Sequence, residues 1–208
     1  MEETLNRHRG IDADKRRALI DAARELFTTT GYEATTMAQV AKRAGVAVGT
    51  VYLYFKNKGD LLLAVKDGWE EEVLHAMSQP DLVSVPHHLR ARPILEACFA
   101  ICARHTQLVQ LMAVQAELIG AWTSEAPAPV RAALHAFLDE AMTAGSIRPV
   151  NTATTAVLLY GMVNSALMQC FVTGDGTDQQ LYLDALVEAI EQWLVNPALL
   201  SHGQPVRD

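Results

Sequence analysis

Apolar side chains recur at the three- and four-residue spacing of an α-helix along most of the chain. No stretch alternates apolar and polar residues with the period of two that a half-buried strand requires. Gly and Pro residues interrupt the helical pattern and predict an all-α fold of about nine helices. The expected helices cover residues 14–30, 37–44, 48–54, 58–78, 93–105, 107–121, 129–144, 152–172 and 178–195, with a loop over 79–93.

The helices expected at 37–44 and 48–54 are too short to be stable alone. We therefore expect them to dock on the helices before and after them, in a small N-terminal domain of residues 1–60. Residues 61–208 then form a larger helical domain.

A helix-turn-helix signature lies in this N-terminal segment. Thr36 and Gln39 have the spacing of a capping box, which satisfies free N–H groups at a helix start. Gly45 supplies the permissive backbone for a sharp turn before the next helix. Two short helices joined by such a turn form the unit that places its second helix in the major groove of DNA.

The second helix carries the residues that favour DNA binding. Val51 and Phe55 are expected to face inward, while the opposite face is free for a partner. Gly49 inside this helix costs about 1 kcal/mol against alanine, and close approach of the backbone to DNA justifies that cost. Outward hydroxyl groups can bind phosphate oxygens, and a lysine at the next helix start adds positive potential. These residues are Thr50, Tyr52, Tyr54 and Lys58.

The sequence from Thr35 to Leu62, with its pattern A-G-V-x-x-G-T-x-Y-x-Y-F-x-x-K, resembles the TetR family of transcription regulators. The preceding segment Leu26-Phe27-Thr28-Thr29-Thr30-Gly31-Tyr32 extends the resemblance. It implies that Val48 and Gly49 lie near bases. It also implies that the DNA backbone is held by Thr36, Thr50, Tyr52, Tyr54 and Lys58. The expected DNA-binding set is Thr36, Arg43, Val48, Gly49, Thr50, Tyr52, Tyr54 and Lys58.

Two positions depart from the family pattern. Ala47 stands where the family often has a capping Ser, and the missing cap is worth about 0.5–2 kcal/mol. Val48 stands at a position that is often polar, which indicates contact with a thymine methyl group rather than a hydrogen bond.

The charge distribution agrees with a DNA-binding head on an acidic body. The net charge of the chain is -7, but residues 1–66 carry +3 and residues 67–208 carry -10. The basic end is therefore the end that holds the helix-turn-helix signature.

The resemblance extends more loosely to Gly145-Ser146-Ile147-Arg148, which looks like the entry to two dimerisation helices. The helices expected at 152–172 and 178–195 are apolar on more than one face, so they can pack inside one subunit and against its twin. The family implies a four-helix homodimer interface, and a two-fold dimer predicts a palindromic operator. A monomeric core is the alternative.

The family also implies an effector pocket between the head and the interface, and a ligand-responsive regulator that is usually a repressor. The large apolar candidates, with few charges among them, indicate a small lipophilic effector. The candidate wall residues are Phe99, Cys102, Met112, Gln115, Trp122, Phe137, Tyr160, Asn164 and Met168. We expect no cofactor.

Cysteine and histidine residues leave a redox- or metal-responsive alternative open. Cys98, Cys102 and His105 share one helix face, and a metal would need a fourth ligand such as His87, His88 or His135. Reduced thiols buried in a core explain the same cysteines, and we favour that interpretation and no metal site.

Other classes of protein are less favoured. The chain has no H-E-x-x-H, G-x-S-x-G or Walker-type pattern that would indicate an enzyme. A helical protein-interaction module would leave the hydroxyl-rich helix face without a purpose. Residues 149–174 lack charge, but Asn and Thr side chains break their apolar character and argue against a membrane span. No secretory signal precedes the first helix, so we expect a cytoplasmic protein.

Overall fold

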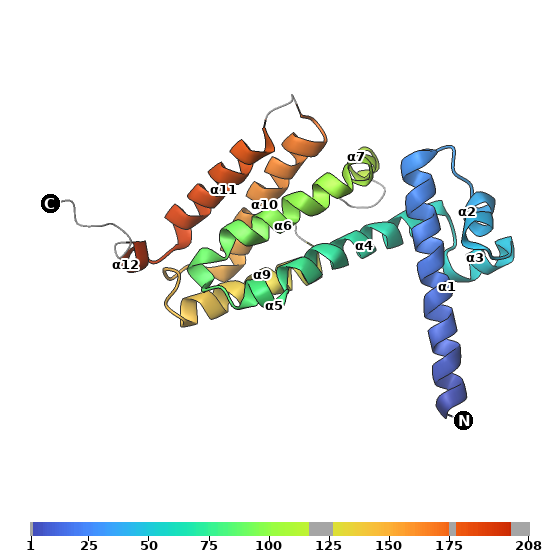
Figure 1. Cartoon of the computed structure of the whole chain (residues 1–208), viewed down its shortest axis with the longest axis horizontal. Helices are drawn as coiled ribbons and strands as arrows, with labels where there is room; N and C mark the ends of the chain where they lie inside the picture. Colours follow the sequence, from blue (N-terminus) through green and yellow to red (C-terminus); the bar gives the residue numbers. More distant parts are fainter. Residues whose placement is uncertain (1, 117–126, 175–177, 201–208) are drawn as a thin grey trace. The chain divides into compact units, whose positions relative to one another are not determined.

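The computed structural model describes residues 2–116, 127–174 and 178–200. The all-α expectation is confirmed: in these segments, helices are joined by turns, and the β structure is limited to one isolated antiparallel bridge between Ile147 and Val195 (Figure 1). The helices are α1 (Glu2–Thr29), α2 (Met37–Ala44), α3 (Val48–Tyr54), α4 (Lys58–Met77), α5 (Pro80–Val83), η1 (His87–Leu89), α6 (Ala91–Arg104), α7 (Thr106–Val114), α9 (Ala128–Thr143), α10 (Thr152–Phe171), α11 (Gln179–Leu194) and α12 (Pro197–Leu200).

The chain forms two compact units. The first contains Met1–Trp69 and Gln107–Ala121, and the second contains Glu70–Thr106 and Trp122–Asp208. The boundary expected at residue 60 falls inside α4, whereas the first unit continues to Trp69. Leu61 and Leu62 belong to the first unit because both are fully buried in its core. The first unit also takes in most of α7, which the sequence pattern assigned to the second domain.

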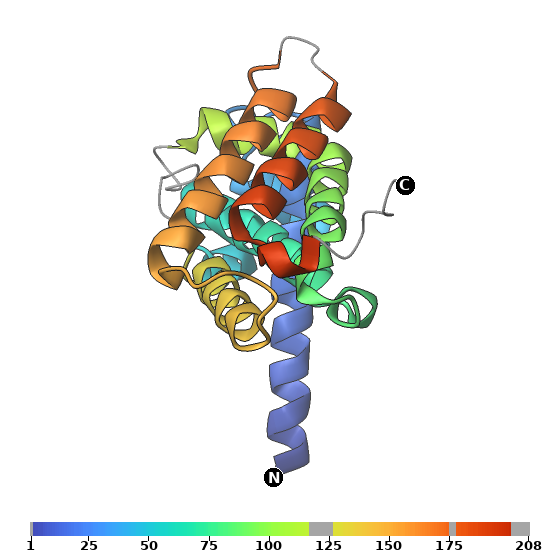
Figure 2. The ribbon, with the colours of Figure 1, turned by 90° about the vertical axis from the view of Figure 1, so that its left-hand side faces the viewer.

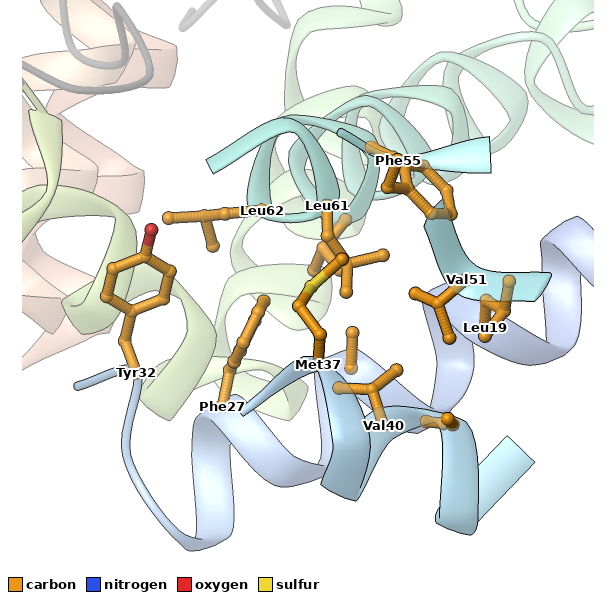
Figure 3. Packing of buried hydrophobic residues seen from close by; sticks show 14 of the residues in the cluster. Leu19, Phe27, Tyr32, Met37, Val40, Val51, Phe55, Leu61 and Leu62 are labelled. Carbon is orange, nitrogen blue, oxygen red and sulfur yellow. The ribbon is translucent and has the colours of Figure 1, made fainter. Parts of the chain in front are cut away.

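The core of the first unit explains why two short helices are stable. Each of the helices α1 to α4, together with α7, contributes buried side chains to one cluster (Figure 3). The rings of Phe27 and Tyr32 meet edge to face, 5.1 Å apart. The main contributors are Leu19, Phe27, Tyr32, Met37, Val40, Val51, Phe55, Leu61, Leu62, Leu108 and Met112.

Helix α1 is longer than the sequence pattern predicts. The expected start at residue 14 is wrong, since the helix begins at Glu2. Residues 12–17 are exposed, so the apolar periodicity that predicts a buried helix begins only near Leu19. Residues 2–13 contain no proline, and a single Gly10 is tolerated within a helix.

The loop expected over 79–93 is also wrong in part. The segment contains α5, the 3₁₀ turn η1 and the first residues of α6. Pro93 fits in the first turn of α6 because the N–H groups there have no partner within the helix. The side chain of Arg90 donates to the carbonyl of Val85 at 2.5 Å, which ties the turn together.

Helix α7 ends at Val114, and Gln115 is a turn residue before the helical Ala116, so the helix expected over 107–121 is interrupted at Gln115. The backbone N–H of Gln115 still donates to the carbonyl of Leu111 at 3.0 Å. Residues 117–121 lie outside the part of the chain that the structure describes.

In the second unit, α10 packs against α6, α9 and α11 (Figures 1 and 2). Asn151 caps α10 and Asp178 caps α11, each accepting a backbone N–H at 2.9 Å. Arg92 on α6 and Asp184 on α11 form an ion pair of 2.9 Å. By length and composition, α10 is the one described helix that could cross a membrane by itself, yet here it packs against three other helices.

Candidate DNA-binding interface

The start of α2 is closed by the capping box that the sequence predicts. The hydroxyl of Thr36 accepts the N–H of Gln39 at 3.2 Å, and the side chain of Gln39 accepts the N–H of Thr36 at 2.7 Å. Both bonds satisfy N–H groups that have no partner within the helix. Thr36 is therefore part of the local fold, and its side chain remains exposed.

The turn between α2 and α3 depends on Gly45. Its φ of 71° lies in the left-handed region that favours glycine. The N–H of Gly45 donates to the carbonyl of Lys42, and the N–H of Val46 donates to that of Ala41. These bonds end α2, and α3 begins three residues after the glycine without a side-chain cap from Ala47.

Helix α3 has one buried and one open face. Val51 is fully buried and Phe55 nearly so, as expected. On the open face, Val48 is 43% exposed, Tyr52 53% and Leu53 83%. Sequence reasoning missed Leu53, although its place four residues after Gly49 puts the two on the same face of the helix.

Gly49 lies on this open face, and no packing within the chain requires it. A Cβ atom added at Gly49 would meet nothing within 4 Å. The described part of the molecule therefore gives no steric reason for a glycine at this position.

Three of the expected DNA-binding side chains are held by groups of the first unit. Arg43 on α2 forms an ion pair of 2.5 Å with Glu25 on α1. The ammonium group of Lys58 donates to the carbonyls of Tyr32 at 2.6 Å and Glu33 at 3.1 Å, and lies 4.3 Å from the centre of the Tyr32 ring. Lys58 thus links the start of α4 to the loop after α1.

The third held side chain is Tyr54, whose hydroxyl donates to Oδ1 of Asp12 at 2.9 Å. This hydrogen bond, with the burial of the ring and the charge of Asp12, raises the pKa of Tyr54 above its ordinary value. For Thr50 and Tyr52, by contrast, the structure gives no side-chain hydrogen bond among the described residues; Tyr52 is exposed and Thr50 is half-buried.

Residues 19–65 match the family described as "Bacterial regulatory proteins, tetR family". The match spans the second half of α1, the helix-turn-helix and the start of α4. This match, with the regulators found among known proteins and solved structures, supports a TetR-family transcriptional regulator. The described part of the chain is helical, with the DNA-binding helix-turn-helix at its N-terminal end.

Known regulators are similar to this sequence to different extents. The HTH-type transcriptional regulator YhgD of Bacillus subtilis (strain 168) is 26% identical over 153 residues, which cover 72% of this chain and 80% of YhgD. The "Fatty acid metabolism regulator protein" of the same organism is 51% identical over 47 residues, covering 23% of this chain and 24% of that protein. The named relatives are regulators rather than enzymes.

Solved TetR-family structures share the fold over nearly their whole length. A regulator from Syntrophomonas wolfei superposes with a TM-score of 0.70 at 16% identity, covering 94% of this chain and 99% of that one. A regulator from Rhodococcus sp. gives a TM-score of 0.69 at 17% identity, covering 86% and 98%.

The expected effector-binding residues are divided between the two units. Met112 is buried in the core of the first unit, and Gln115 follows α7 there. The second unit holds buried residues on α6 and half-buried residues on α9 and α10, whereas Trp122 lies outside the described residues. Those of the second unit are Phe99, Cys102, Phe137, Tyr160, Asn164 and Met168.

Ring contacts and one pKa shift characterise the second-unit residues. Phe99 meets Phe171 edge to face at 6.1 Å, and Phe137 lies 5.8 Å from the ring of His87. Burial, and then the charge of Glu70, raise the pKa of Tyr160. Its phenol is therefore neutral near pH 7 and can act as a hydrogen-bond donor.

Burial changes the acidity of the thiols on α6. Burial raises the pKa of Cys98 to about 11 and that of Cys102 to about 12, so neither is a thiolate near neutral pH. His105 Nε2 lies 3.1 Å from a carboxylate oxygen of Glu72, which also pairs with Arg104. Among the described residues, no three His, Cys, Asp or Glu side chains form a group that could hold a metal ion.

Proposed function

We propose that this regulator binds a palindromic operator as a homodimer, with α3 of each subunit in the major groove. The observation that carries the proposal is the open face of α3, where Val48, Gly49 and Tyr52 are exposed while Val51 and Phe55 close the core behind them. Apolar and hydroxyl groups on one short helix suit base edges and phosphates together.

In this proposal, each contact has a distinct role. Thr50 and Tyr52 bind phosphate through their hydroxyls, and Val48 packs on a thymine methyl where Gly49 lets the backbone come close. The capping hydroxyl of Thr36 lies at the start of α2. An ammonium group has three donors, so Lys58 keeps one for a phosphate after serving two carbonyls. Arg43 and Tyr54 complete the set by exchanging their carboxylate partners for phosphate.

The outward faces of α10 and α11 are the proposed dimer interface. Val157 and Leu158 on α10 and Leu181 on α11 are exposed large apolar residues, and α10 carries no charged residue. Gly161 and Ser165 continue the exposed face of α10 with small side chains. Two copies of this helix pair bury these faces against each other as a four-helix interface.

We assign effector binding to the second unit and operator binding to the first. The candidate wall in the second unit is apolar, with Tyr160 and Asn164 as its polar groups, which suits a small lipophilic effector. Repression that the effector relieves, in the cytoplasm, is the mode of regulation that we propose from the family resemblance.

Selection of binding sites from random duplex DNA tests the operator proposal. The comparison is wild type against a Thr50→Ala, Tyr52→Ala variant at one fixed salt concentration. Lys58→Ala is avoided because Lys58 also holds two carbonyls of the fold. Leu89→Ala, an exposed apolar residue of the second unit, is the matched control.

The proposal predicts that wild type and the control enrich an inverted repeat and that the α3 variant does not. Enrichment of the same sequence by all three proteins would show that α3 does not read the operator. No enrichment by any of them would favour a helical protein-interaction module.

A further inference from the structure

The hydrogen bond between Tyr54 and Asp12 joins two residues that lie 42 positions apart in the sequence. Tyr54 ends α3, and Asp12 lies on the exposed N-terminal part of α1. One turn further along α1, the guanidinium of Arg16 lies 5.6 Å from the centre of the Phe55 ring. The two contacts together place this part of α1 against the C-terminal end of α3.

The hydroxyl of Tyr54 has one proton to donate. A carboxylate oxygen and a phosphate oxygen are acceptors of the same kind, since both are anionic and both form short charge-assisted bonds. The proton that Asp12 now accepts is therefore the proton that a DNA phosphate would need. Both acceptors cannot take it at once.

We propose that Asp12 is a phosphate surrogate that occupies Tyr54 in the DNA-free protein and lowers the affinity of the regulator for DNA until the phosphate displaces it. The inference rests on the proposed function, in which Tyr54 contacts the DNA backbone. The charge of Asp12 adds to the effect, because a carboxylate within hydrogen-bond distance of the Tyr54 oxygen repels a phosphate that approaches the same atom.

A positioning role for Asp12 makes the opposite prediction. If the carboxylate held the ring of Tyr54 in the orientation that DNA requires, its removal would weaken binding. A surrogate acceptor competes with DNA, so its removal strengthens binding. The sign of the change in affinity therefore separates the two roles.

The test measures dissociation constants for a mixed-sequence duplex at low salt, because phosphate contacts carry no sequence information. Asp12→Ala is compared with Asp14→Ala, which removes an equal charge from the same exposed part of α1. Each variant is made with Tyr54 and with Tyr54→Phe, and thermal melting checks that all of them fold.

We expect Asp12→Ala to bind about three- to tenfold more tightly than wild type, on the scale of one hydrogen bond exchanged for another. Most of this gain persists as salt is raised, whereas the smaller gain of Asp14→Ala is screened away. In the wild-type background, Tyr54→Phe should weaken DNA binding little, because the bond to Asp12 that must break offsets the new bond to phosphate. In the Asp12→Ala background, the same substitution should weaken DNA binding more.

Weaker binding by Asp12→Ala, or a gain no larger than that of Asp14→Ala, overturns the inference. So does a Tyr54→Phe substitution that is neutral in both backgrounds. A Thr50→Ala, Tyr52→Ala variant that binds the duplex as tightly as wild type instead removes the proposed DNA-binding face. Failure of the Asp12 inference is thereby distinguished from failure of the proposed function.

Discussion

The hydroxyl of Thr36 sets the start of α2, and its loss has a defined cost. Thr36→Ala removes one of the two capping-box bonds, so we expect the free energy of unfolding to fall by about 0.5–2 kcal/mol. Thr36→Ser keeps the hydroxyl, so its free energy of unfolding should fall by much less. Urea denaturation at one protein concentration measures both, and equal losses in the two variants would contradict a capping role.

The carboxylate of Glu72 makes stability depend on pH. Burial alone would raise its pKa, but hydrogen bonds from Arg104 and His105, and their charges, lower it below the ordinary value of 4.5. A depressed carboxyl pKa contributes stability at pH values above 4.5, and that contribution is lost as the pH falls through the folded-state pKa.

We therefore expect Glu72→Gln to reduce stability near pH 7 by about 1 kcal/mol or less, since the side chains are partly exposed to solvent. The difference from wild type should vanish on acidification below the pKa of Glu72. Melting curves across pH measure it, with the exposed Glu71→Gln as control. A difference that stays constant down to the lowest pH would argue against this account.

Single residues were predictable from the sequence where their partners lie nearby in the chain. Thr36 and Gln39 are three positions apart, and their spacing alone indicates the capping box. The carboxylates Asp12 and Glu25, which hold Tyr54 and Arg43, could not be predicted in this way. Their contacts depend on how α1 packs beside α2 and α3, and local patterns do not encode that packing.

At the scale of the element, α3 combines weak local stability with an exposed face that we propose binds DNA. Gly49 lowers helix stability, yet its site has room for a side chain. We expect Gly49→Ala to raise the free energy of unfolding by about 0.5–1 kcal/mol. The same change should weaken operator binding about tenfold, on the scale of one lost contact, because the new methyl group meets DNA.

The matched control is Gly68→Ala on α4, where an added Cβ lies 3.4 Å from the flexible end of Arg24. It should raise stability without changing affinity. Urea denaturation and fluorescence anisotropy with the selected operator measure the two quantities. If Gly49→Ala gains stability and keeps full affinity, the glycine does not serve close approach to DNA.

The sequence pattern predicted elements well where burial gives them a periodic apolar stripe, as in α2, α10 and α11. It failed for the exposed N-terminal part of α1, where no stripe exists, and for α5 and η1, which are too short to show a period. The membership of α7 in the first unit depends on long-range packing of Leu108 and Met112, for which the pattern contains no signal.

At the scale of the whole molecule, the account requires two subunits joined through α10 and α11. Leu158→Arg puts a charge on the outward face of α10, and burying it without a partner costs several kcal/mol. We expect the dimer dissociation constant to rise about a hundredfold or more. Leu89→Arg, on η1, is the control, and sedimentation over a range of concentrations is the measurement. An unchanged dimer in Leu158→Arg would place the interface elsewhere.

The most direct test of the central claim is a hydroxyl-radical footprint of the wild-type protein on its selected duplex. The account predicts two protected patches related by two-fold symmetry, centred on major grooves about one helical turn or a multiple of it apart. A single patch, or uniform protection without symmetry, would contradict an operator read by α3 helices of two paired subunits.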